Sequence, residues 1–173
     1  MKIGLFFGSF NPIHVGHLLI GNTVVESTDL QQVWYVVSPQ NPFKKKKNLL
    51  HEQDRFDMVY AAIYDNNNLR ASDIEFKMPR PSYTIDTLTY LSEKYPQHEF
   101  SLIIGEDNLK HFDKWKNHEQ ILEYYNLLVI HREEGSVPTP FHEHKKTTFV
   151  DAPQMALSAT YIRNAIKNNK SIR

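Results

Sequence analysis

Two histidines near the N-terminus have the residue type and the spacing that phosphate chemistry requires. His14 and His17 stand three residues apart, shortly after Gly8. On a helix, residues at this spacing share one face, so both imidazoles can donate hydrogen bonds to the same polyphosphate. Phosphate charge favours the protonated form of an imidazole, whose unperturbed pKa is about 6.5. Gly8 is expected to allow a tight turn, and the free N–H groups of a helix start add an anion site.

A second cluster of this kind lies near the C-terminus. Ser158 and Thr160 can cap a final helix and meet phosphate at its N-terminus. Arg163 offers a planar, permanently charged fork for phosphate oxygens. The alternatives are histidines that only pack a helix and an arginine on a solvated face. The placement of the first cluster directly after an apolar run favours phosphate binding.

The segments that must position these clusters alternate between two patterns. Short apolar runs predict strands, and apolar residues at helical spacing predict helices. The strands are expected at residues 3–7, 33–37, 69–76, 100–104, 127–130 and 147–150, and the helices at 15–27, 52–64, 83–94, 118–124 and from 158 onward. This alternation predicts an α/β fold, with a doubly wound, mostly parallel sheet and helices on both faces. Ligands of such sheets bind beyond the carboxyl ends of the strands.

Composition limits the other classes of function. The 173 residues include no cysteine, which excludes disulfides and thiolate catalysis. Twenty basic and twenty acidic side chains cancel, so we expect neither a nucleic-acid nor a membrane partner. No apolar run approaches the roughly 20 residues of a membrane span, and no signal peptide is recognised. We expect one cytoplasmic domain over residues 1–173 and leave open whether it forms a homo-oligomer.

The two clusters together resemble a known superfamily. The segment from His14 to His17 matches the HxGH motif of nucleotidyltransferases, and residues 157–163 are similar to their second signature, usually written ISSTxIR. The resemblance implies a Rossmann-like nucleotidyltransferase fold, ATP as substrate with Mg²⁺, and transfer without a covalent enzyme intermediate. The ATP-binding residues that it implies are Gly8, Ser9, Phe10, His14, His17, Gly105, Asp107, Ser158, Thr160 and Arg163. The catalytic residues that it implies are His14, His17, Lys44 and Arg163.

The residues between the two signatures look most like bacterial nicotinate mononucleotide adenylyltransferases. The segments that carry this resemblance are 38–44, 80–88, 104–109, 112–115 and 131–132. The family's activity, adenylyl transfer from ATP to nicotinate mononucleotide in NAD biosynthesis, is therefore expected. The resemblance implies that Gly105 and Asp107 hold the ATP ribose and that Trp115 stacks on the pyridine ring, whereas Trp34 belongs to the core. The implied acceptor-binding residues are Asn41, Lys44, Thr84, Trp115 and Arg132.

Departures from the family and alternatives to it stay open at this point. The family often has two glycines where Phe7-Gly8 stands and an aspartate at Asn11, and its chains usually continue beyond Arg173. A related transferase that uses nicotinamide mononucleotide, phosphopantetheine or CTP would share the same chemistry. A non-catalytic nucleotide-binding module is the alternative from another class. A metal site at residues 142–144 is disfavoured because adjacent loop residues usually form a solvated turn, so we expect no protein-held metal.

Overall fold

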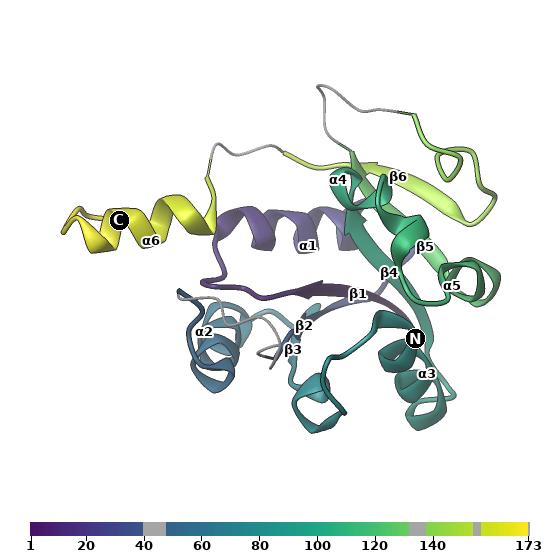
Figure 1. The fold of residues 1–173 in the computed structure, drawn as a ribbon, viewed down its shortest axis with the longest axis horizontal. Coiled ribbons are helices and arrows are strands. Elements are labelled where there is room, and N and C mark those ends of the chain that lie inside the picture. Colours follow the sequence, from purple (N-terminus) through teal and green to yellow (C-terminus); the bar gives the residue numbers. More distant parts are fainter. Residues whose placement is uncertain (40–47, 132–137, 154–156, 173) are drawn as a thin grey trace.

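The computed structural model describes residues 1–39, 48–131, 138–153 and 157–172. Its centre is a six-stranded sheet in which all strand pairs are parallel (Figure 1). The strands are β1 (Lys2–Gly8), β2 (Gln32–Val37), β3 (Leu69–Ser72), β4 (Glu99–Gly105), β5 (Asn126–His131) and β6 (Thr147–Asp151). Their order across the sheet is β3-β2-β1-β4-β5-β6. The predicted doubly wound α/β fold is confirmed.

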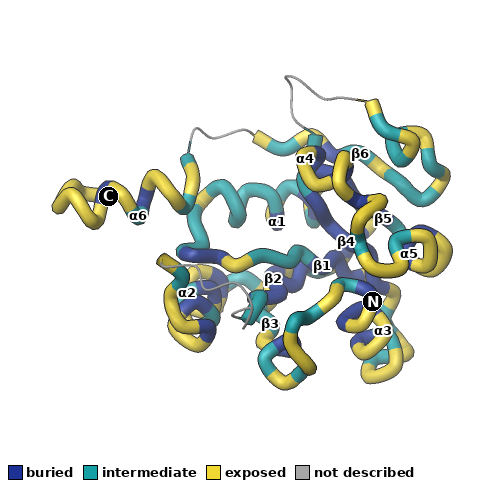
Figure 2. Tube along the Cα trace, viewed as in Figure 1, coloured by how far each residue is buried: buried dark blue, intermediate teal, exposed yellow. Residues whose placement is uncertain are grey.

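Helices cover both faces of this sheet. The α-helices are α1 (Val15–Ser27), α2 (Glu52–Ile63), α3 (Thr84–Lys94), α4 (Glu106–Leu109), α5 (His118–Tyr124) and α6 (Ala159–Lys167), and two short 3-10 helices are η1 (Ile74–Lys77) and η2 (Phe112–Lys114). Residues of α1 and α2 share one hydrophobic core, and residues of α3 and α5 share the other. Figure 2 shows that α6 extends from the body and is mostly exposed. In the described residues, no helix is long and apolar enough to cross a membrane.

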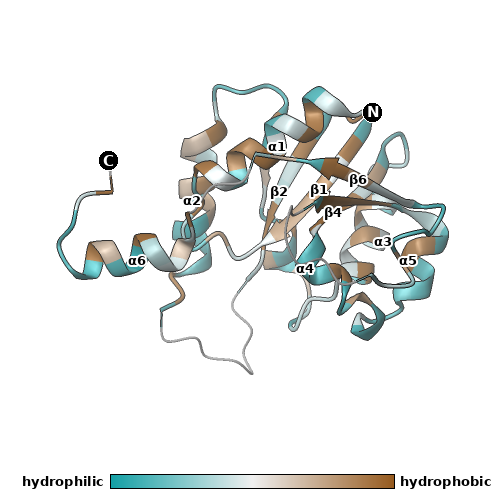
Figure 3. Ribbon diagram, turned by 90° about the horizontal axis from the view of Figure 1, so that it is seen from above, coloured by the Kyte–Doolittle hydropathy of each residue, from teal (hydrophilic) through white to brown (hydrophobic). Residues whose placement is uncertain are grey.

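The strands form because their apolar residues are buried from both sides. In β2, Trp34 and Val36 pack toward α3, whereas Val33, Tyr35 and Val37 pack toward α1 and α2. Adjacent residues of a strand point to opposite faces, so a sheet covered on both sides requires an apolar run and not an alternating pattern. Hydrophobic residues accordingly gather along the central strands in Figure 3. Trp34 is 2% exposed, which confirms its predicted place in the core.

The predicted strand at 69–76 is too long. β3 ends at Ser72, and residues 74–77 form η1. The Ser72 hydroxyl accepts a hydrogen bond from the N–H of Ile74 at 3.4 Å, and the N–H of Phe76 donates to the carbonyl of Asp73. These local hydrogen bonds replace the inter-strand hydrogen bonds that a longer β3 would make. Ile74 is buried in the 3-10 turn, and its apolar side chain led to the prediction of a longer strand.

The order of strands reverses next to β1. β2 and β3 lie on one side of β1, and the chain then returns to place β4 on the other side, with Leu5 opposite both Trp34 and Leu102. In parallel sheets, ligands bind at this switch point, beyond the carboxyl ends of the strands. The loop after β1 and the turn after β4 therefore frame the candidate site.

Candidate active site

The loop after β1 is shaped by Phe10. Gly8 was expected to supply a tight turn, and this prediction is wrong because Gly8 is the last residue of β1 and pairs with Val37. The left-handed backbone conformation lies at Phe10, with φ 46°. The Phe10 ring is buried edge-on against Phe6 and Tyr35. A Cβ added at Gly8 would lie 3.0 Å from that ring, so a side chain there would require the ring of Phe10 to shift.

The two histidines meet at the start of α1. His14 is the N-cap, and its Nδ1 accepts from the N–H of Gly16 at 3.1 Å, while Nδ1 of His17 accepts from the N–H of His14 at 3.1 Å. This reciprocal arrangement is a capping box. The imidazole rings stack with centroids 3.8 Å apart, so the predicted shared face is confirmed although His14 precedes the helix. Because each Nδ1 accepts, the neutral tautomer carries its hydrogen on Nε2, where it can donate to a ligand.

Both histidines are neutral at pH 7 in the unliganded protein. Burial lowers the pKa of His14, and burial together with repulsion from His14 lowers the pKa of His17 to about 4. Removing an imidazolium from water is costly unless an anion compensates it. A bound polyphosphate would provide that anion, so the positive charge of the two histidines depends on the ligand.

The low pKa of His17 makes stability depend on pH. Between pH 6.5 and 4 the unfolded chain binds a proton that the folded chain does not, so the free energy of unfolding falls as the pH drops. Replacing His17 by glutamine keeps the N3 acceptor of the capping box and removes the titration. Urea unfolding at pH 7 and at pH 4.5 should show the wild type losing about 1–3 kcal/mol more than His17→Gln. Equal losses of unfolding free energy in the two proteins would contradict the lowered pKa of His17.

The C-terminal cluster reaches the first loop. Nη1 of Arg163 donates to the carbonyl of Asn11 at 2.7 Å, although 152 residues separate them in sequence. The Ser158 hydroxyl accepts from the N–H of Tyr161 at 3.1 Å, which confirms Ser158 as the N-cap of α6. Thr160 does not cap: it lies inside the helix, where its hydroxyl accepts from Nη2 of Arg163 at 3.2 Å. Thr160 thereby orients the arginine fork.

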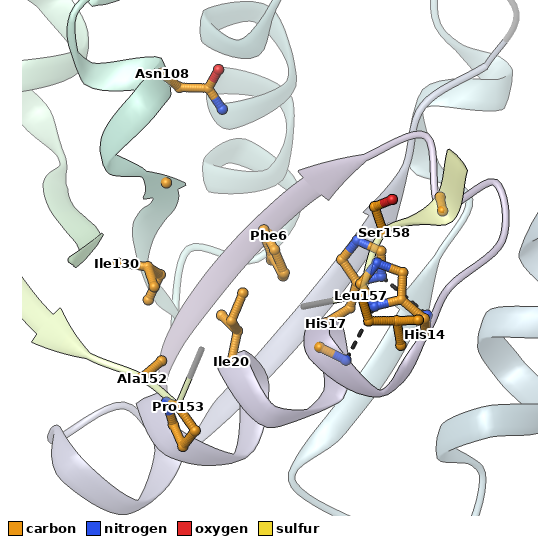
Figure 4. A pocket seen from close by; sticks show the side chains of 13 residues that line it. Phe6, His14, His17, Ile20, Asn108, Ile130, Ala152, Pro153, Leu157 and Ser158 are labelled. Atoms are coloured by element: carbon orange, nitrogen blue, oxygen red, sulfur yellow. Dashed lines mark hydrogen bonds between the residues drawn. The ribbon is translucent and has the colours of Figure 1, made fainter. Parts of the chain in front are cut away.

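A cavity of about 400 Å³ lies between the two histidines and the start of α6, beyond the carboxyl ends of β1 and β4 (Figure 4). Of the second cluster, Ser158 lines it, whereas Thr160 and Arg163 do not. Figure 4 shows the stacked histidines beside Leu157 and Ser158, with Phe6 and Ile20 along the wall. The lining residues are Phe6, His14, Gly16, His17, Ile20, Gly105, Asn108, Ile130, Ala152, Pro153, Leu157, Ser158 and Ala159. His14, His17 and Ser158 lie together at one end of the cavity, and Ile130, Ala152 and Pro153 lie at another. A lining that has both polar and apolar side chains suits a ligand with a charged and a flat part.

The turn after β4 closes another side of the cavity. Gly105 is the N-cap of α4, and a Cβ there would meet open space, while Asp107 is exposed. The buried Glu106 anchors the turn, since its carboxylate oxygens lie 3.1 Å from Nδ1 of His131 and 3.3 Å from Nε2 of His142. Glu106 was not predicted as a functional residue, because its partners come from β5 and a later loop. Within the described residues, no three acidic or histidine side chains could hold a metal.

Two predicted acceptor residues lie outside the cavity lining, on segments that one ion pair joins. Thr84 is the first residue of α3, and the half-buried Trp115 packs on Phe112 with ring centroids 5.2 Å apart. Nζ of Lys116 lies 3.2 Å from Oδ2 of Asp86, which joins the segment of Trp115 to the first turn of α3. The predicted residues Asn41, Lys44 and Arg132 lie outside the described residues.

The chain is similar in sequence to a known protein family and to several named proteins. The chain matches the sequence model of the cytidylyltransferase-like family over residues 5–165. It is 68% identical to a probable nicotinate-nucleotide adenylyltransferase of Cytophaga hutchinsonii and 53% identical to one of Flavobacterium johnsoniae. In both comparisons the match covers 100% of this chain and 90% of the relative.

Solved structures share the fold. Nicotinic acid mononucleotide adenylyltransferase of Plasmodium falciparum, complexed with NaAD, superposes with a TM-score of 0.80 at 19% identity, covering 99% of this chain and 86% of that one. A putative nicotinate-nucleotide adenylyltransferase from Vibrio parahaemolyticus superposes with a TM-score of 0.70 at 26% identity, covering 99% and 90%. At these identities the likeness establishes the architecture.

Proposed function

Because the chain belongs to the cytidylyltransferase-like family, we propose that its site transfers the adenylyl group of ATP to nicotinate mononucleotide. The products are nicotinate adenine dinucleotide and pyrophosphate, and the reaction belongs to NAD biosynthesis. The names of the similar curated proteins support this activity. The observation that carries it is the stacked pair His14 and His17, which lines a cavity at the switch point of the sheet beside the N-cap of α6, while Arg163 of the same helix is bonded to the loop that precedes the histidines.

The reaction needs positioning more than covalent chemistry. An oxygen of the 5′-phosphate of nicotinate mononucleotide forms a bond to the α-phosphorus of ATP. The bond from the α-phosphorus to the oxygen that bridges the α- and β-phosphates breaks, and pyrophosphate leaves with that electron pair. No side-chain nucleophile is required. The protein holds the reactants in line and stabilises the charge that develops on the phosphate oxygens.

The charged residues divide this stabilisation between them. His14 and His17 would donate from Nε2 to the triphosphate, and Arg163 would hold its departing end from the start of α6. Lys44 would add a cation near the reacting phosphates. Mg²⁺, when bound with ATP, would neutralise phosphate charge.

The two nucleosides would occupy different sides of the sheet's crevice. Gly105 and Asp107 would hold the ATP ribose at the turn after β4, since a carboxylate commonly accepts from ribose hydroxyls in such folds. Trp115 would stack on the pyridine ring, and Thr84 would donate to the acceptor nucleotide from the start of α3. Asn41 and Arg132 complete the proposed acceptor site, with Arg132 on the pyridine carboxylate.

Acceptor choice is tested by pyrophosphate release from ATP and Mg²⁺. Nicotinate mononucleotide, nicotinamide mononucleotide and phosphopantetheine are offered separately to the purified protein. We expect release with nicotinate mononucleotide to exceed release with the amide by about tenfold or more, because a carboxylate that pairs with arginine is lost in the amide. Release with phosphopantetheine alone would keep the transferase chemistry and reject this acceptor. No pyrophosphate release with any of the three acceptors would contradict the proposed enzymatic activity.

A further inference from the structure

Arg55 holds together segments of the site without lining the cavity. It lies on α2 and is completely buried. Its Nε donates to the carbonyl of Leu50 at 2.8 Å, and its Nη1 donates to the carbonyls of Ser9 and Ser38, both at 2.7 Å. These carbonyls belong to the loop after β1, the end of β2 and the approach to α2. One guanidinium therefore fixes the relative positions of three segments.

The same segments are tied to the second signature. Nδ2 of Asn11 donates to the carbonyl of Asn48 at 2.7 Å, and its Oδ1 accepts from the N–H of Leu50 at 3.2 Å. The carbonyl of Asn11 accepts from Arg163. A continuous set of hydrogen bonds thus runs from Arg55, through the loop before α2 and Asn11, to Arg163.

A neighbouring carboxylate balances the buried charge. Glu52 stands three residues before Arg55 on α2, is itself buried, and attracts the guanidinium electrostatically. Its Oε2 accepts from Nη2 of Arg80, which lies four residues before Thr84. The first turn of α2 therefore links the loop after β1 to the segment that leads into α3.

The choice of arginine at this position is informative. Burying a guanidinium is expensive, and an apolar side chain of similar volume often gives equal or greater stability. Arginine is the one side chain whose rigid fork carries five N–H donors, so it can satisfy carbonyls from several segments at once. A charge retained in the core at this cost fits a role in fixing geometry.

We propose that Arg55 is a positioning residue for adenylyl transfer, which acts by holding the loop after β1, and with it the two histidines, against the end of β2. This inference rests on the proposed function. Arg55 touches no reactant. Displacing a phosphate-binding loop by about 1 Å can cost about 10²-fold in rate, because in-line geometry is lost.

The test compares Arg55→Lys and Arg55→Met with Val59→Ala. Val59 lies one turn further along the same helix and is fully buried, but its apolar side chain can make no hydrogen bond to the carbonyls that Arg55 holds. We expect kcat to fall about 10- to 100-fold and the KM for ATP to rise in both Arg55 variants. Val59→Ala should lower Tm and keep wild-type kcat and KM. Wild-type kinetics in a folded Arg55→Lys variant would overturn the proposal.

Hydrogen exchange supplies a readout independent of activity. In the unliganded protein, amides of residues 9–17 should exchange faster in Arg55→Lys than in the wild type or Val59→Ala. Unchanged exchange there would also overturn the proposal, even if Arg55→Met failed to fold. If the wild type released no pyrophosphate, the proposed function would fail, and exchange alone would still decide whether Arg55 positions the loop.

Discussion

Replacing His17 by alanine should lower kcat by about 10²–10³-fold at saturating ATP and nicotinate mononucleotide. That is the typical cost of removing one preorganised donor from a developing oxyanion. The ring of His17 lines the cavity beside that of His14, and the alanine variant loses the Nε2 donor of His17 while that of His14 remains. The measurement is steady-state pyrophosphate release, with near-wild-type circular dichroism showing that the fold is kept.

Two further variants separate catalysis from helix capping. His17→Gln retains an acceptor for the N–H of His14 and should keep the wild-type Tm, yet stay at least about 10²-fold below the wild type in kcat. Val24→Ala removes a buried side chain from the same helix and should lose stability without losing turnover. An unchanged kcat in the His17→Ala variant would contradict the assignment of this cavity as the active site.

The ligand dependence of the histidine charge explains how such a site can select its substrate. With the pKa of His17 lowered to about 4, its imidazole is neutral in the unliganded protein, and a bound anion favours its protonation. A triphosphate carries enough negative charge to offset the burial that disfavours the imidazolium. Charge that appears only when the polyphosphate is bound is available for the transition state, where catalysis needs it.

Local sequence patterns predicted the fold because its strands are apolar on both faces. Apolar spacing predicted the helix at 15–27 with its observed bounds, and Ser158, which was predicted to cap the last helix, is its N-cap. The errors arose at residues whose backbone conformation is determined by tertiary packing. Phe10 takes the left-handed backbone conformation that glycine was expected to take, because its ring is held between Phe6 and Tyr35.

The supporting residues of the site could not be predicted in the same way. Arg55 donates to carbonyls 46 and 17 residues away in sequence, and a backbone carbonyl leaves no trace in residue type. Glu106 likewise depends on histidines brought to it by β5 and by a later loop. Residues that contact substrate are recognisable by their chemistry, whereas residues that position them are recognisable only from the folded contacts.

Replacing Arg163 by alanine should lower kcat/KM for ATP by about 10²-fold or more. The variant loses the charged fork at the start of α6 and also the hydrogen bond that joins α6 to the carbonyl of Asn11. Arg163→Lys separates these two contributions. Lysine restores a point charge without the planar fork that contacts Asn11 and Thr160 together, so it should recover only part of the activity.

The matched control for Arg163 is Lys167→Ala, which removes a cation one turn further along the same exposed helix. Its kcat/KM should equal that of the wild type, because a general loss of positive charge on α6 would be screened by solvent. The decisive measurement is the dependence of pyrophosphate release on ATP concentration for all three variants. If Lys167→Ala fell as far as Arg163→Ala, α6 would act through its overall charge, and the specific contact between the two signatures would not be the source of catalysis.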